Sequence, residues 1–241
     1  MIKQSFIFLE KISVNKEKSI WKQGINDWYD FLRKESVKGL SKEKKLFYDR
    51  RIKEAQDALG QENASYFIGK LPKKEMWRLY SVFKENSGFL DIETDSYGKI
   101  VVVGISNYYS TNHFVRGANL DVISIQKELS KYKLVITFNG SSFDLPKLKL
   151  FGVSINCTHI DLKPLCVNLG LKGGLKEVER ILELRRPEHL YGNPVDAWKA
   201  FHASGDREYL ELLLDYNRED VENLRGIMEV VYERLKKIYK E

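Results

Sequence analysis

Cysteine is scarce in this chain. Its 241 residues include two cysteines, Cys157 and Cys166, which form no CxxC pair. A disulfide framework needs several cysteines, and a zinc knuckle needs paired cysteine or histidine ligands at short spacing. We therefore exclude both kinds of site and expect two buried thiols.

Long apolar runs are also missing. No stretch approaches the roughly 18 apolar residues that a membrane-spanning helix requires. The N-terminus places charges around a short apolar stretch and contains no small-residue cleavage site, so no secretory signal is expected. The sequence thus predicts a cytoplasmic protein with no membrane partner.

Positive charge is concentrated in one part of the chain. Residues 1–86 hold 19 Lys and Arg against 12 Asp and Glu, whereas residues 87–241 hold 21 against 22. An excess of positive charge attracts polyanions such as nucleic acid. The alternative is a lysine-rich surface that only faces solvent. We predict a basic N-terminal segment, 1–86, followed by a separate domain, 87–241.

Apolar spacing in the first 86 residues predicts helices. Asn26 is placed to cap one helix, Ser41 opens a second, and Pro72 suits the first turn of a third. Apolar residues recur at helical spacing in each and are expected to form a core. The pattern breaks at residues 86–88, which favours a boundary there.

The rest of the chain has a mixed pattern. Five β-rich runs fall at 89–93, 99–106, 113–117, 133–138 and 158–162. The first three are separated by turn residues, as in an antiparallel meander, and the last two are each entered through a helix. Most of the remainder has helical periodicity. This order predicts an α/β domain with a mixed five-stranded sheet flanked by helices.

Two acids lie in the first predicted strand. The run FLDIE places Asp91 and Glu93 two residues apart, so both side chains point to one face. A buried ionised carboxylate is costly unless it is paired or bound to metal, and two adjacent carboxylates repel unless a cation holds them. We predict a hard divalent metal here. The alternative is an edge strand with a solvated acidic face.

Two further acids strengthen the metal hypothesis. Asp144 follows a turn at Asn139, in the first turn of a helix that Ser141 can cap. Asp220 comes four residues after Tyr216, so the two share one helix face. Carboxylates suit Mg²⁺ or Mn²⁺, and two such ions about 4 Å apart can orient an attacking water and stabilise the leaving oxygen of a phosphodiester.

These residues stand in three motifs: LDIET at 90–94, NGSSFD at 139–144 and YNRED at 216–220. In this order they resemble the DEDD, or DnaQ-like, 3′→5′ exonucleases of the ribonuclease H-like fold. The Y-x-x-x-D form of the third motif resembles the tyrosine subclass, DEDDy. Residues 201–224 are also similar to the YprB-like branch. The resemblance covers residues 89 to about 232.

The resemblance implies a role for each motif residue. Asp91 would bridge two ions, with Glu93 and Asp220 on the ion beside the nucleophile and Asp144 on the second ion, through water. Tyr216 would orient or deprotonate the attacking water, and a phenol pKa near 10 favours orientation. None of the four histidines falls in a motif, so no catalytic histidine is expected.

Four residues are candidates for substrate contact: Thr94, Asn139, Phe143 and Lys176. The ring of Phe143 can stack on a terminal base, and Lys176 can bind a phosphate. The alternatives are a core position for Phe143 and an ordinary helix N-terminus around Lys176. The basic segment is similar to the helix-hairpin-helix entry of YprB-like proteins but lacks a Gly-x-Gly hairpin around residues 9–13. A phosphate grip by residues 9–16 is therefore not supported, although the lysines of the segment can still steer a strand.

The combined prediction is a metal-dependent 3′→5′ exonuclease that acts on single-stranded DNA or RNA and releases nucleoside 5′-monophosphates. One alternative is a catalytically silent nucleic-acid-binding module, which the presence of all four acids and Tyr216 disfavours. Another is a structure-selective endonuclease or helicase accessory.

Overall fold

The computed structural model describes residues 1–240. The chain divides into two compact units, one from Met1 to Lys84 and one from Glu85 onward. The first unit is helical, and the second contains the sheet. That residues 1–86 and 87–241 are separate domains stays a prediction.

The N-terminal unit forms helices as predicted. A Ser or Asp side chain caps each of the first three: Ser13 for α1 (Val14–Trp21), Asp27 for α2 (Trp28–Arg33) and Ser41 for α3 (Lys42–Gly60). The expected cap at Asn26 is wrong by one residue, because Asp27 Oδ1 accepts the Asp30 N–H at 2.9 Å.

The helix expected after Pro72 is mostly a tighter 3-10 helix, η3 (Lys73–Leu79), which continues into the short α4 (Tyr80–Phe83). Side chains at i and i+3 eclipse in a 3-10 helix. Glu75 and Arg78 use this spacing, with Arg78 Nε 2.8 Å from Glu75 Oε2. Shorter 3-10 turns are η1 (Ile2–Gln4), η2 (Ala64–Phe67) and η4 (Lys84–Asn86).

A buried ion pair joins the two ends of the N-terminal unit. The side chains of Glu17 and Arg78 have no exposed surface, and Arg78 Nη2 lies 3.0 Å from Glu17 Oε2. Glu17 Oε1 also accepts the Ser5 hydroxyl at 2.9 Å and the Phe6 N–H at 2.6 Å. Breaking such a pair leaves an uncompensated buried charge and costs roughly 3–5 kcal/mol. This pair therefore stabilises the unit only while both partners are present.

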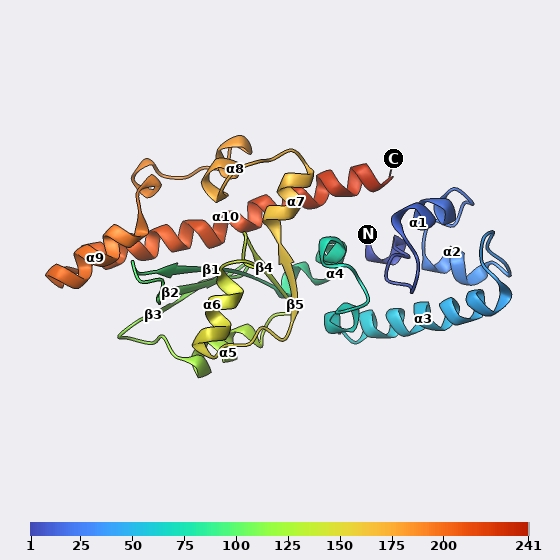
Figure 1. Cartoon of the computed structure of the whole chain (residues 1–241), viewed down its shortest axis with the longest axis horizontal. Helices are drawn as coiled ribbons and strands as arrows, with labels where there is room; N and C mark the ends of the chain where they lie inside the picture. Colours follow the sequence, from blue (N-terminus) through green and yellow to red (C-terminus); the bar gives the residue numbers. More distant parts are fainter. Residues whose placement is uncertain (241) are drawn as a thin grey trace. The chain divides into compact units, whose positions relative to one another are not determined.

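The second unit contains a five-stranded sheet in the order β3-β2-β1-β4-β5 (Figure 1). Its strands are β1 (Ser87–Thr94), β2 (Ile100–Ser106), β3 (Thr111–Val115), β4 (Leu134–Thr137) and β5 (Thr158–Asp161). The first three pair antiparallel, and β4 and β5 continue the sheet from β1 in parallel. The predicted mixed sheet is confirmed.

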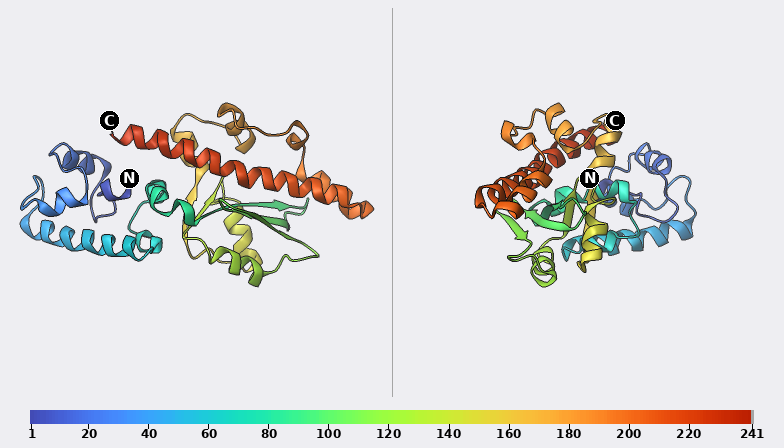
Figure 2. Two further views of the ribbon diagram at one scale, coloured as in Figure 1. Left: turned by 180° about the vertical axis from the view of Figure 1, so that it is seen from behind. Right: turned by 60° about the vertical axis from the view of Figure 1, so that its left-hand side comes forward.

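Helices cover both faces of the sheet (Figures 1 and 2): α5 (Val122–Leu129) and α6 (Asp144–Phe151) on one face, and the long α10 (Arg207–Lys240) on the other. Leu90 and Ile92 of β1 pack in one core with Leu129 of α5 and Leu148 of α6. Since side chains alternate along a strand, positions 91 and 93 face α10.

The remaining elements of the second unit are α7 (Leu162–Asn168), α8 (Leu175–Ile181), the 3-10 turn η5 (Glu188–Tyr191) and α9 (Pro194–Ser204). The sequence pattern did not predict α7. Cys166 is buried in it, whereas Cys157 is only half-buried, and both are free thiols.

Among the described residues, no helix combines the length and apolar character needed to cross a membrane.

Candidate metal centre

Three carboxylates meet between β1 and α10. Each of Asp91, Glu93 and Asp220 offers a ligand oxygen, and these oxygens lie within 4.8 Å of one another. Glu93 is 9% exposed, and Asp91 and Asp220 are partly buried. Glu93 and Asp220 are 127 residues apart in the sequence. They come together because α10 crosses the face of the sheet to which the Glu93 side chain points.

Asn217, which the sequence pattern did not single out, ties α10 to the first of these acids. Its side-chain amide is buried, and Nδ2 donates to Asp91 Oδ2 at 2.9 Å. Gly104 lies opposite Asp91 on β2, where a Cβ would stand 1.8 Å from Asn217 Oδ1. The glycine therefore permits the close approach of α10 to the sheet. The available signal was the position of Asn217 inside YNRED, next to Tyr216.

Asp144 approaches the same strand from α6. It is 2% exposed, and its Oδ1 accepts the Ile92 N–H at 3.1 Å. The expected cap at Ser141 is wrong, since α6 begins at Asp144 after an N-cap residue, Phe143, that makes no side-chain cap bond. Asp161 holds the preceding turn instead.

The turn before α6 depends on Asp161, at the end of β5. Its two carboxylate oxygens accept the N–H groups of Asn139 at 2.8 Å and Ser141 at 3.0 Å. Asn139 adopts a left-handed conformation with φ of 66°, a region in which asparagine is enriched. No local pattern couples the run THIDL to NGSSFD, because the two meet only through the parallel pairing of β4 and β5.

Burial raises the pKa values of these acids. The pKa of Asp91 lies well above its ordinary value because of burial and the neighbouring carboxylates of Asp144, Asp220 and Glu93. Burial, with Asp220 nearby, raises the pKa of Glu93 to about 8, although Lys176 opposes this shift. Burial also raises the pKa of Asp144 to about 7. Several buried acids that disfavour ionisation together are a suitable site for a divalent cation, whose charge offsets theirs.

These pKa values predict a pH-dependent stability of the metal-free protein. The folded chain retains protons on Glu93 up to about pH 8 and on Asp144 up to about pH 7, whereas the unfolded chain releases them near pH 4. The folded state binds more protons over this range, so the free energy of unfolding falls as the pH rises from about 4.5 to 8.

We expect the Glu93→Gln variant in EDTA to lose less stability than the wild type between pH 5 and pH 8, by more than about 1 kcal/mol. Denaturant unfolding at both pH values measures the difference. Added Mn²⁺ should reduce the decline in the wild type. Parallel pH profiles for the two proteins in EDTA would contradict the assignment.

Tyr216 lies on α10 one turn before Asp220, but its hydroxyl is engaged elsewhere. The hydroxyl donates to the His189 carbonyl at 2.9 Å, and the ring packs in a cluster with Leu190 and Trp198. A Cβ at Gly192 would lie 2.3 Å from this hydroxyl. The structure therefore brings Asp91, Glu93 and Asp220 together and directs the Tyr216 hydroxyl to the η5 turn.

The four substrate-contact candidates come from β1, from the turn before α6 and from α8. Phe143 precedes Asp144 and is 40% exposed, with Lys147 Nζ 5.0 Å from its ring centroid, so it is not a core residue. Thr94 ends β1, where the pairing register with β2 shifts. Lys176 acts electrostatically on Glu93 and Asp220, and its Nζ donates to the Gly192 carbonyl at 3.0 Å. Asn139 opens the turn that Asp161 holds.

The fold agrees with a comparison to known families. The family model described as the RNase_H superfamily matches residues 88–232, more than half of the chain. The chain belongs to the RNase_H superfamily. All four acids and Tyr216 lie within the matched residues of this RNase_H superfamily domain.

No curated protein matches the chain. Among solved structures, it is similar to the family B DNA polymerase from the hyperthermophilic archaeon Pyrobaculum calidifontis. The sequences are 14% identical and the TM-score is 0.47. The match covers 60% of this chain and 24% of the polymerase, so this chain corresponds to about a quarter of that protein.

Proposed function

We propose that this protein is a metal-dependent 3′→5′ exonuclease of the DEDD, DnaQ-like type, in the tyrosine subclass and YprB-like branch. Its substrate would be single-stranded DNA or RNA, and its products nucleoside 5′-monophosphates. The observation that carries the proposal is the cluster of Asp91, Glu93 and Asp220 in a member of the RNase_H superfamily. The order of the three sequence motifs supports the finer assignment.

The donor set of the cluster suits Mg²⁺ or Mn²⁺. All its ligands are carboxylate oxygens, which hard divalent cations prefer. Asp91 would contribute to both of two ion sites, Glu93 and Asp220 to one, and Asp144 to the other through water. Bound divalent ions would lower the pKa of an attacking water and neutralise charge on the phosphodiester.

The chain's own side chains would position the reactants. In the proposed reaction, the Tyr216 hydroxyl breaks its hydrogen bond to the His189 carbonyl and forms one with the attacking water instead. Phe143 offers an exposed ring to the terminal base. Lys176, beside Glu93 and Asp220, supplies a positive charge to a phosphate. Thr94 and Asn139 would contact the terminal nucleotide.

Matched single-stranded DNA and RNA oligonucleotides test whether the protein is an enzyme at all. Incubation with Mg²⁺ or Mn²⁺ should release mononucleotides, and EDTA should stop the release. Binding of the oligonucleotides without cleavage under any of these conditions would favour the silent binding module instead.

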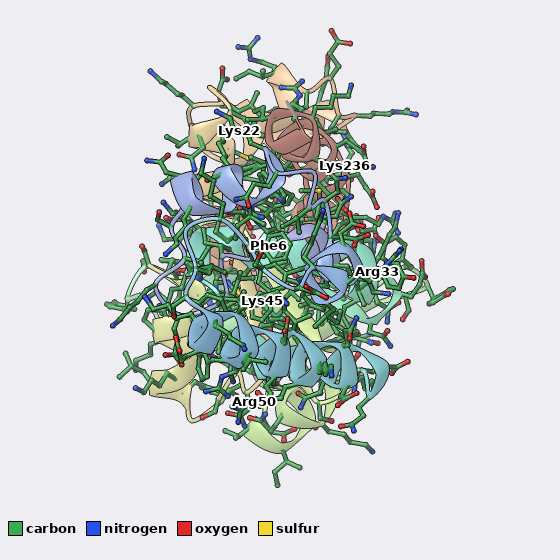
Figure 3. All side chains as sticks on the ribbon, turned by 90° about the vertical axis from the view of Figure 1, so that its right-hand side faces the viewer. Phe6, Lys22, Arg33, Lys45, Arg50 and Lys236 are labelled. Carbon is green, nitrogen blue, oxygen red and sulfur yellow. The ribbon has the colours of Figure 1, made fainter. Side chains whose placement is uncertain are left out.

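A separate prediction concerns the basic N-terminal unit. Lys42, Lys44 and Lys45 are three sequence neighbours, but only the first two are exposed. Lys45 is buried, and its Nζ lies 2.7 Å from Asp49 Oδ1 and 4.9 Å from the Phe31 ring centroid, so it cannot reach a nucleic acid. Figure 3 labels Lys45 together with Arg50 of the same helix.

If this unit steers a single strand, changing Lys42, Lys44 and Arg50 to Gln should weaken binding at low salt. Arg50 is exposed on α3. For each phosphate that the variant no longer neutralises, the slope of log affinity against log salt should become shallower by about 0.7. Fluorescence anisotropy with a labelled oligonucleotide across a salt series measures this slope. An unchanged slope would mean that these residues only face solvent.

A further inference from the structure

A second buried ion pair, between Glu179 and Arg186, lies next to Asp220. The side chains of Arg186 and Glu179 have no exposed surface. Arg186 Nε donates to one Glu179 oxygen at 2.7 Å, and Arg186 Nη2 donates to the other at 2.8 Å. Arg186 Nη1 also donates to the Leu190 carbonyl at 3.3 Å. The guanidinium is therefore held in one orientation by α8 and the η5 turn.

The same guanidinium reaches the metal centre. Arg186 Nη2 donates to Oδ1 of Asp220, whose carboxylate is one of the three in the cluster. Its charge is already balanced by Glu179, so the pair as a whole is neutral. An unpaired cation at this place would compete with a metal ion for Asp220. The neutral Glu179–Arg186 pair can instead orient the Asp220 carboxylate without taking the place of the metal.

We propose that the Glu179–Arg186 pair positions Asp220 for a divalent cation. The hydrogen bond to Oδ1 holds the plane of the Asp220 carboxylate and leaves its second oxygen free of the guanidinium. This inference rests on the proposed metal site. Groups that orient metal ligands in this way commonly contribute 10- to 100-fold to metal affinity.

Arginine and lysine should differ sharply at this position. A guanidinium can donate to Glu179 and to Asp220 at the same time from a planar fork, whereas an ammonium group is a compact charge on a flexible stem. Arg186→Lys keeps the charge beside buried Glu179, which limits the loss of stability, but it removes the geometry that orients Asp220.

The test is calorimetric titration of the full metal-free chain with Mn²⁺. We expect Arg186→Lys to weaken Mn²⁺ binding by roughly 10- to 100-fold relative to the wild type. The matched control is Arg180→Lys on α8, whose guanidinium lies 2.7 Å from Glu177 but is 68% exposed. This control should bind Mn²⁺ as the wild type does.

Two further measurements separate positioning from a general structural role. The Mn²⁺ concentration for half-maximal cleavage should rise in Arg186→Lys by the same factor as the dissociation constant, while the rate at saturating Mn²⁺ recovers. Unfolding in EDTA reports whether the variant is folded. If it is not, Glu179→Gln, which keeps the shape of the carboxyl group, decides instead and should also weaken Mn²⁺ binding.

The outcomes are distinguishable from failure of the proposed function. If the wild type and Asp91→Asn take up Mn²⁺ equally, the metal site itself is wrong. If the wild type binds Mn²⁺ at this site and a folded Arg186→Lys binds it equally or more tightly, the positioning role is overturned and the metal site stands.

Discussion

Asp91→Asn is expected to abolish cleavage while the protein stays folded. The amide fills the same space and can still accept the hydrogen bond from Asn217, but it removes the charge that both proposed ion sites share. Loss of a single group that stabilises developing charge already costs roughly 10²–10³-fold, so we expect more than about 10³-fold. Glu93→Gln should behave in the same way. Release of mononucleotides at saturating Mg²⁺ measures the effect.

Removal of one acid should also stabilise the metal-free protein by roughly 1 kcal/mol at pH 8 and above, because fewer buried carboxylates then ionise and repel one another. Asp215→Asn is the matched control, since Asp215 lies on α10 near Asp220 but its side chain is 44% exposed and paired with Arg218 at 2.6 Å. The control should retain full activity. Near-normal turnover in Asp91→Asn would show that the acids are not the catalytic centre.

Tyr216→Phe should lower the rate by roughly 10²-fold, the usual scale for loss of a positioned group that handles a proton. The change removes one hydroxyl and no charge, so Mn²⁺ affinity should survive. Loss of the hydrogen bond to the His189 carbonyl should lower the free energy of unfolding by only about 1 kcal/mol.

Tyr209→Phe is the control for this change, because Tyr209 lies on the same helix and is 41% exposed. It should leave both the rate and the stability unchanged. A Tyr216→Phe enzyme with wild-type turnover, or one that loses Mn²⁺ affinity, would mean that the hydroxyl serves only to hold the η5 turn.

The sheet could be predicted from the sequence because the patterns that identify its strands are local. Alternation and turn residues identify each strand, and the same alternation places Asp91 and Glu93 on one face. The spacing of Tyr216 and Asp220 likewise follows from helical periodicity. These features need only short windows of sequence.

The residues that support the acids and the turn before α6 could not be predicted, because each contacts a partner far away in the sequence. Asn217 contacts Asp91, Asp161 holds the turn at Asn139, and Arg186 contacts Asp220 only once the chain has folded. Apart from the place of Asn217 inside YNRED, nothing in the local pattern around these residues distinguishes them from ordinary polar surface. The same limit applies to Lys45, which is part of a basic run by composition but is buried in the structure.

The most direct test of the central claim follows single-stranded oligonucleotides that carry a 5′ label, an internal label or a blocked 3′ end, over time with Mg²⁺. A 3′→5′ exonuclease should shorten the 5′-labelled strand one nucleotide at a time, release the internal label later than the terminal nucleotide, and leave the blocked strand intact. Early release of internal fragments, or equal cleavage of the blocked strand, would contradict the account and favour an endonuclease.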